Sequence, residues 1–93
     1  MIHLLCRNRV SDFDRWKAVF DSHADAHRAA GLVLRKLWRA TEDPDEVFFL
    51  FSVESVERAR EFMNAPDSAA AGVAAGVLDG DYHFIADSNG YPA

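Results

Sequence analysis

The segment Glu46–Val53, with the sequence EVFFLFSV, constrains the fold more than any other part of this chain. Both of its alternating sets of side chains are apolar, since Phe48 and Leu50 lie between Val47 and Phe51. A strand that is apolar on both sides is typical of the interior of a sheet, because burial of each apolar side chain stabilises the fold. The sequence therefore predicts a β-sheet in which this strand is central.

Predicted strands and helices alternate around this segment. The Asp-Pro-Asp and Asp-Gly sequences at 43–45 and 79–80 are typical of turns, and Gly31 is typical of a residue that ends a helix. Ser11 and Asp14 form a weak capping box at the start of the first helix. We expect strands at 2–9, 32–40, 46–53 and 82–87, and helices at 12–30, 55–64 and 67–77.

The order of these elements, βαββαβ, is that of the ferredoxin-like α+β fold. We expect one domain over residues 1–93, with residues 88–93 as a C-terminal tail. Right-handed crossovers place the first and third strands at the centre of a four-stranded antiparallel sheet, with the helices on one face. The second strand carries Arg35, Lys36 and Arg39, and this charge is typical of an edge strand.

The other face of the predicted sheet lacks cover within one chain. Because residues 46–53 direct apolar side chains toward both faces, a monomer would expose an apolar surface of the kind that marks interfaces. We therefore expect a homodimer in which two open faces pack together into a dimeric α+β barrel. The alternative is that a twisted edge or the C-terminal tail covers this face.

Charge and composition exclude several classes of function. The net charge is −5 and the basic residues form no cluster, which argues against binding to nucleic acid. The single cysteine, Cys6, excludes an internal disulfide framework. The longest strongly apolar stretch, Val47–Phe51, is too short to span a bilayer, and Met1–Val10 lacks the pattern of a signal peptide. We expect a cytoplasmic protein that does not bind membranes.

Two histidines one helical turn apart, His23 and His27, lie on the apolar face of the first predicted helix. The same face carries Phe13, Trp16 and Phe20. Polar rings directed at a core need hydrogen-bond partners, because a buried polar group without a partner is destabilising. Either the two rings are satisfied by structural hydrogen bonds, or they line a cavity.

A metal site is one candidate function for this pair, because histidines at i and i+4 can bind the same ion, most plausibly zinc. However, Ala24 follows the first histidine, where the catalytic zinc motif has a glutamate. Asp25 points away from the pair, so a third ligand would have to be His3 or His83. We expect no bound metal.

Acid–base chemistry in an apolar pocket is the second candidate function. A neutral histidine suits removal of a proton from an activated carbon or a phenol, and burial lowers its pKa. His27 is nearest the centre of the apolar face, so it is the candidate base, and His23 would orient or polarise the substrate. Trp16 and Phe20 could stack on a planar molecule.

Six stretches of the chain carry a resemblance to a known group: 10–23, 28–31, 43–47, 57–62, 65–67 and 75–77. They resemble a small branch of the dimeric α+β barrel superfamily that includes the antibiotic-biosynthesis monooxygenases. The resemblance spans residues 1–87. It implies a ferredoxin-like domain that pairs into a dimeric barrel.

The same resemblance implies a range of activities, since this superfamily includes cofactor-free monooxygenases, haem-degrading enzymes, lactone isomerases and polyketide cyclases. The haem-degrading branch uses an asparagine on the first strand, which Asn8 matches in position. It also uses a tryptophan and a histidine in the second half, and residues 55–78 contain neither. We therefore do not expect haem degradation.

These arguments predict a small-molecule enzyme of the cofactor-independent monooxygenase, isomerase or cyclase kind. Its substrate would be a small aromatic or planar molecule, held between the first helix and the sheet without an organic cofactor. The alternative is a non-catalytic ligand-binding or stress-related dimeric module. The candidate catalytic residues are His27 and His23, and the candidate substrate-binding residues are Trp16, Phe20, Phe13 and Asn8.

Overall fold

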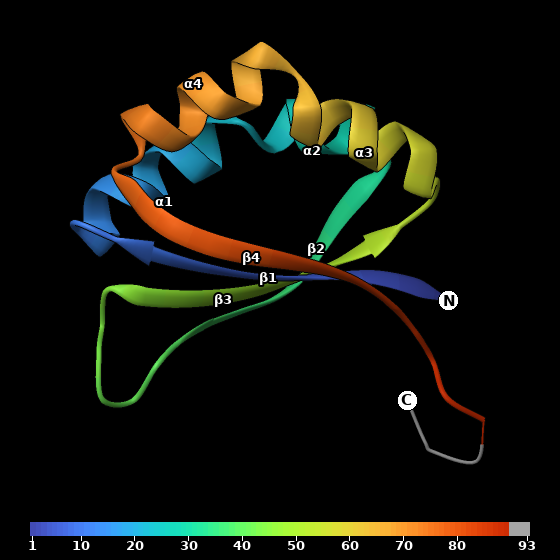
Figure 1. Ribbon diagram of the computed structural model, residues 1–93, viewed down its shortest axis with the longest axis horizontal. Helices are drawn as coiled ribbons and strands as arrows, with labels where there is room; N and C mark the ends of the chain where they lie inside the picture. Colours follow the sequence, from blue (N-terminus) through green and yellow to red (C-terminus); the bar gives the residue numbers. More distant parts are fainter. Residues whose placement is uncertain (90–93) are drawn as a thin grey trace.

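The computed structural model describes residues 1–89, and this part of the chain forms one four-stranded sheet and four helices. All four helices lie on one side of the sheet, and the other side, the bare face, carries no helix of residues 1–89 (Figure 1). Part of the predicted C-terminal tail, residues 90–93, lies outside the described residues. The elements are β1 (Ile2–Val10), α1 (Phe13–Ser22), α2 (Ala24–Ala29), β2 (Leu32–Arg39), β3 (Glu46–Val53), α3 (Val56–Asn64), α4 (Pro66–Ala74) and β4 (Val77–Ala86).

The strands form an antiparallel sheet in the order β2-β3-β1-β4. The two-sided apolar strand β3 therefore has a neighbour on each edge, as its sequence predicts. The basic strand β2 lies at the edge, also as predicted. The ferredoxin-like α+β fold is confirmed, with its first and third strands at the centre.

The hydrophobic core lies between the helices and the sheet, and alternate residues of β1 and β3 face it. Trp16 of α1 is buried there, with its ring stacked on Phe20 at a centroid distance of 4.6 Å and tilted against Phe49 at 5.4 Å. Burial of large apolar side chains contributes roughly 1.5–3 kcal/mol each. The buried residues that the two central strands supply on this side are Leu4, Cys6, Asn8, Val10, Val47, Phe49, Phe51 and Val53.

The prediction of one continuous helix over residues 12–30 is wrong, because α1 and α2 are separate helices divided at His23. Nδ1 of His23 lies 2.8 Å from the carbonyl oxygen of Val19, and the hydroxyl of Ser22 donates to the same oxygen at 2.6 Å. Side chains that bond to nearby carbonyls compete with the helical hydrogen-bond pattern. The helix resumes at once, since the His27 N–H donates to the His23 carbonyl at 3.0 Å.

The start of the first helix also differs from the prediction. Asp12, rather than Ser11, caps α1, and its carboxylate accepts a hydrogen bond from the Arg15 N–H at 3.3 Å. The carboxylate of Asp45 accepts from the Phe13 N–H at 3.0 Å, so a second side chain satisfies the helix start. The predicted helix end is correct, because Gly31 follows α2 with a positive φ of 76°.

The last strand begins five residues earlier than predicted, at Val77 instead of residue 82. The chain turns at Gly76, whose φ is 74°, and not at the Asp-Gly sequence at 79–80, which lies within β4. Gly80 pairs with Asn8 in the ladder, and a Cβ there would lie 2.6 Å from the nearer polar atom of the Asn8 side-chain amide. The glycine therefore serves a close approach between strands, not a turn.

The bare face of the sheet combines apolar and charged side chains. Arg7 forms ion pairs with Asp81 at 3.0 Å, Asp79 at 3.3 Å and Glu46 at 3.4 Å. Apolar side chains surround this charged group. They include Val33, Trp38 and Ile85, which are 46%, 46% and 42% exposed, and the half-buried Leu5, Phe48 and Leu50.

Candidate functional site

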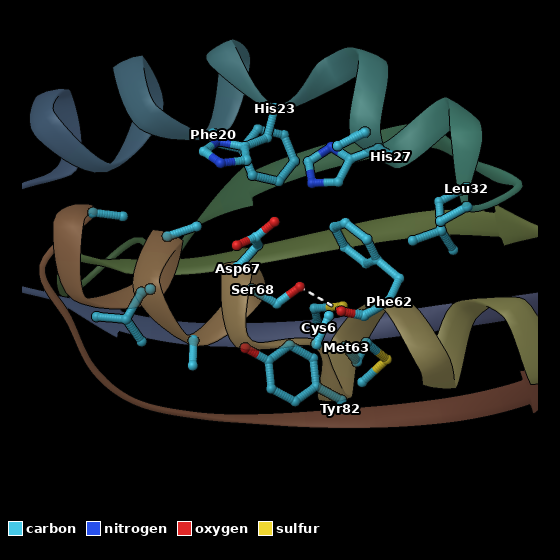
Figure 2. Close-up of a pocket in the computed structure, with 18 of the residues that line it drawn as sticks. Cys6, Phe20, His23, His27, Leu32, Phe62, Met63, Asp67, Ser68 and Tyr82 are labelled. Carbon is cyan, nitrogen blue, oxygen red and sulfur yellow. Dashed lines mark hydrogen bonds between the residues drawn. The ribbon is translucent and has the colours of Figure 1, made fainter.

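A cavity of about 1240 Å³ lies between the helices and the sheet. Helices α1 and α2 form one wall, α3 and α4 form the facing wall, and β1, β3 and β4 supply the floor (Figure 2). Its lining is mainly apolar, with a few polar groups, as is usual for sites that bind small molecules. The cavity lies in the region between the first helix and the sheet where the sequence predicts a binding pocket.

His27 projects from α2 into this cavity, where three phenylalanine rings surround its imidazole (Figure 2). The ring centroids lie 5.0 Å from Phe20, 5.2 Å from Phe51 and 5.6 Å from Phe62. Among residues 1–89, no hydrogen-bond partner is seen for either ring nitrogen. Burial lowers the pKa of His27, and the nearby His23 lowers it further. The imidazole is therefore neutral at pH 7 and free to accept a proton.

His23 also lines the cavity, but its ring is tied to the end of α1. Nδ1 lies 2.8 Å from the Val19 carbonyl oxygen and 3.1 Å from the Ser22 hydroxyl. Because a carbonyl only accepts hydrogen bonds, Nδ1 carries the proton in the neutral ring. Nε2 is then left with its lone pair. The two histidines thus differ, since one is fixed by a backbone bond and the other is held by ring contacts alone.

The aromatic candidates divide into two groups. Trp16 and Phe20 line the cavity, stacked on each other, together with Phe49. Phe13 packs on Trp16 at a centroid distance of 5.9 Å but does not line the cavity. The guanidinium of Arg39 covers its ring at 3.8 Å, in a cation–π contact.

Asn8 is 5% exposed and lies on the cavity floor beside Tyr82 of β4. With its amide oxygen toward α1, Asn8 accepts a hydrogen bond from the indole Nε1–H of Trp16 at 3.2 Å. Its amide nitrogen then donates to the Arg7 carbonyl at 3.0 Å and to the Tyr82 oxygen at 3.1 Å. Every polar atom of this buried amide has a partner, so Asn8 joins α1, β1 and β4.

Cys6 lines the same floor, two residues before Asn8. Burial raises the pKa of its thiol to about 12, and the charge of Asp81 acts in the same direction. The thiol therefore stays protonated at neutral pH. It is a packing residue and not a nucleophile, because the thiolate is the reactive form.

The sequence analysis did not single out Tyr82, Asp67 or Ser68, all of which line the cavity. The Asp67 carboxylate points from α4 toward the histidines (Figure 2), whereas Ser68 donates to the Phe62 carbonyl. Tyr82 and Phe84 pair with the core residues Cys6 and Leu4, so they lie on the side of the sheet that faces the helices. A register shift between Arg9 and Val10 interrupts the alternation at the start of β4, so simple alternation from Val77 does not predict this face.

The two histidines proposed as third metal ligands are not near His23 and His27. His3 and His83 lie at alternate positions to the core residues of their strands, so they face the bare side of the sheet. His3 bonds to Asp87 at 2.8 Å, and His83 pairs with Asp81 at 3.3 Å. Within residues 1–89, no group of three or more His, Cys, Asp or Glu side chains could hold a metal ion.

No family model matches the sequence, and no curated protein sequence matches it. Solved structures match the whole fold. A candidate antibiotic biosynthesis monooxygenase from Bordetella bronchiseptica has a TM-score of 0.76 at 15% identity, over 94% of this chain and 96% of that one. The chain has the fold of the antibiotic biosynthesis monooxygenases.

Two further structures show how broad this fold is. A variant of SnoaB, a cofactor-independent oxygenase from Streptomyces nogalater, gives a TM-score of 0.74 at 14% identity, over 99% of this chain and 97% of that one. An uncharacterised NIPSNAP domain protein from Burkholderia xenovorans gives a TM-score of 0.70 at 11% identity, over the full length of both chains. At such identities the likeness shows the fold that the resemblance implied, and the activity must be argued from the site.

No helix within residues 1–89 is both long and apolar enough to cross a bilayer.

Proposed function

We propose that this chain is a small-molecule enzyme of the cofactor-independent monooxygenase, isomerase or cyclase kind, with His27 as its general base. The observation that carries the proposal is the position of His27, a neutral imidazole without a hydrogen-bond partner among residues 1–89, at the wall of an apolar cavity. A histidine with a structural role would be bonded to a neighbouring group, as His23 is.

The reaction would begin with transfer of one proton. His27 removes a proton from an acidic C–H or O–H group of the substrate, and the electron pair stays on the substrate. The pair must then be delocalised, so the substrate is a planar molecule with a conjugated ring or carbonyl system. The aromatic walls formed by Trp16, Phe20 and Phe62 suit such a shape.

The two histidines would have different roles. Burial and the neighbouring His23 both favour the neutral form of His27, which keeps the base available at pH 7. Nδ1 of His23 is engaged by the Val19 carbonyl, so only Nε2 can face the substrate. His23 would accept a hydrogen bond from a substrate hydroxyl and thereby orient it.

We also propose that two chains form a homodimer through the bare face of the sheet. Exposed Val33, Trp38 and Ile85 on that face support this pairing, since contiguous apolar patches commonly mark interfaces. The cavity lies on the opposite side of the sheet and stays accessible in such a dimer. The cytoplasm is the proposed location.

The test of the proposed function is the variant His27→Ala, assayed against a panel of planar hydroxyaromatic compounds. We expect the wild type to consume oxygen or isomerise one of them, and His27→Ala to lose at least 100-fold in kcat, the usual contribution of a general base. The melting temperature should fall only modestly, because among residues 1–89 the change leaves no hydrogen-bond partner of His27 unsatisfied and removes only ring contacts of a half-buried side chain. Phe13→Leu, outside the cavity, is the matched control and should keep full activity.

Other results would contradict parts of this proposal. Ligand binding without turnover by the wild type would favour the alternative, a non-catalytic binding module. A His27→Ala protein that melts far lower and binds the ligand normally would show that His27 is a core residue with a structural role only.

A further inference from the structure

The hydrogen bonds around Asn8 have a fixed direction, because a donor-only group and an acceptor-only group lie at their ends. The indole Nε1–H of Trp16 can only donate, and the backbone carbonyl of Arg7 can only accept. They lie 3.2 Å and 3.0 Å from opposite atoms of the Asn8 amide. The oxygen of the amide must therefore face Trp16, and its nitrogen must face Arg7.

This orientation determines the role of Tyr82. The second N–H of the Asn8 amide points at the Tyr82 oxygen, 3.1 Å away, so that oxygen accepts a hydrogen bond. A phenol oxygen that accepts from Asn8 keeps its own O–H for another partner. Within residues 1–89, no partner other than Asn8 is seen for this hydroxyl.

Tyr82 lies where this O–H can reach the cavity. Tyr82 pairs with Cys6 in the β1–β4 ladder and lines the cavity floor with Cys6 and Asn8. Its ring lies on the floor, opposite the wall that carries His23 and His27 (Figure 2). Gly80 permits the arrangement, since any side chain there would collide with Asn8.

We infer that the Tyr82 hydroxyl is the hydrogen-bond donor of the cavity and binds a carbonyl or enolate oxygen of the ligand. Trp16 and Asn8 are positioning residues, which fix the direction of the Tyr82 O–H. The inference rests on the proposed function for the cavity as a small-molecule site and names the chemistry at its floor. His27 would act on the proton of the ligand, and Tyr82 on the oxygen that gains the electron density.

Protonation of Tyr82 agrees with this role. Burial raises the pKa of its phenol, and the Cys6 and Asp81 groups act in the same direction. The hydroxyl therefore keeps its proton throughout the neutral range, and a carbonyl or enolate oxygen is the natural acceptor for it. A donor that already accepts one hydrogen bond is also polarised toward donating the next.

The first experiment needs no ligand. The chain has two tryptophans, of which Trp16 is 2% exposed and Trp38 is 46% exposed, so Trp38 serves as an internal control. In ¹⁵N-resolved NMR spectra of the Tyr82→Phe protein, one side-chain N–H of Asn8 should shift while the Trp16 indole N–H stays in place. A large shift of the Trp16 indole would overturn the inference, because it would mean that Tyr82, and not Trp16, fixes the amide.

The second experiment uses two planar probes of the same shape, 2-acetylnaphthalene and 2-isopropenylnaphthalene, which differ in a C=O against a C=CH₂ group. Their Kd values are measured by equilibrium dialysis. Tyr82→Phe should weaken binding of the ketone by about five- to tenfold, the effect of one hydrogen bond, and leave the alkene within about twofold. Equal loss for both probes, or loss for neither, would overturn the donor role.

The two experiments separate this inference from the proposed function. If neither probe binds the wild type, the cavity is not a site for planar ligands of this kind. That result contradicts the proposed function and the ligand class assigned to Tyr82. The NMR result would still decide the direction of the Asn8 bonds.

Discussion

At the scale of single residues, His27 is held by ring contacts instead of hydrogen bonds. Three phenylalanine rings lie within 5.6 Å of its centroid, and the residue is half-buried. An imidazole in such surroundings gives up part of its hydration and gains packing in return. A phenylalanine would pack as well and carry no polar atom, so the presence of a histidine favours a chemical role over a structural one.

Replacing His27 with phenylalanine tests whether the polar imidazole destabilises the folded protein in its apolar surroundings. Because burial lowers the folded-state pKa of His27 below its ordinary value of 6.5, protonation favours the unfolded state. The wild type therefore keeps its full stability above about pH 6.5 and loses part of it as the pH falls through the folded-state pKa. His27→Phe lacks this loss, so its stability advantage should grow between pH 8 and pH 5.

Urea unfolding of the two proteins at each pH measures the difference. Other titrating groups are common to both chains, so their effects cancel in the comparison. If the difference in free energy of unfolding between His27→Phe and the wild type narrows as the pH falls, protonated His27 gains a partner in the folded state, contrary to the lowered pKa.

At the scale of elements, the helix break and the early start of β4 place the cavity groups. The break at His23 separates α1 from α2. At this break the His23 ring bonds to the Val19 carbonyl. The early start of β4 pairs Arg7 and Arg9 with Asp79 and keeps Tyr82 beside Asn8. Both features are local, and both determine which side chains face the cavity.

The glycine in β4 gives the sharpest test at this scale. Gly80→Ala would place a Cβ 2.5 Å from the Arg7 carbonyl oxygen and 2.6 Å from the Asn8 side-chain amide. We expect it to lower the free energy of unfolding by about 1–3 kcal/mol, the usual effect of overpacking. Gly72→Ala in α4 is the matched control, since a Cβ there meets nothing within 4 Å.

The control should be neutral or stabilising by up to about 1 kcal/mol, because alanine favours the helix more than glycine does. Both variants can be measured by urea unfolding at pH 7. Equal stability of Gly80→Ala and the wild type would indicate that β1 and β4 leave enough room for a side chain at residue 80.

The sequence predicted the elements whose signals agree with one another. The two-sided apolarity of residues 46–53 placed β3, and the charges of residues 32–40 placed β2 at the edge. Elements with conflicting signals were mispredicted. The Asp-Gly sequence at 79–80 is typical of a turn, but ion pairs from Arg7 and Arg9 hold Asp79 within a strand. The apolar residues keep their helical spacing across the break at His23, so the sequence pattern alone does not indicate that α1 and α2 are separate helices.

The residues of the candidate site could be predicted where the periodicity of a helix or strand shows which face a side chain takes. His27, His23, Trp16 and Phe20 all line the cavity, as their shared face indicates. Phe13 shares that face of α1 but packs under the guanidinium of Arg39 from strand β2. A contact between residues so far apart in the sequence cannot be read from the periodicity of one helix. Tyr82 was missed because its face depends on the register of β4 against β1, which shifts between Arg9 and Val10.

At the scale of the whole molecule, the sheet separates two surfaces of different composition. The helix side holds the cavity, and the bare side exposes apolar groups around the Arg7 ion pairs. The exposed hydrophobic residue Val73 lies on α4, on the helix side, and is 77% exposed. Exposure alone therefore does not identify an interface, whereas several exposed apolar side chains on one face of the sheet, such as Val33 and Trp38, support the proposed dimer.

A homodimer through the bare face can be tested with a matched pair of charged substitutions. We expect sedimentation equilibrium at micromolar concentration to give twice the 10.4 kDa mass of one chain. Trp38→Glu places a charge on the bare face and should give a monomer, because an unpaired charge buried in an interface is strongly unfavourable. Val73→Glu places the same charge on the helix side and should leave the dimer intact. A wild type that sediments as a 10.4 kDa monomer would contradict the pairing. If Val73→Glu instead dissociates the dimer and Trp38→Glu does not, the two chains associate through their helices, and the cavity would then lie at the interface.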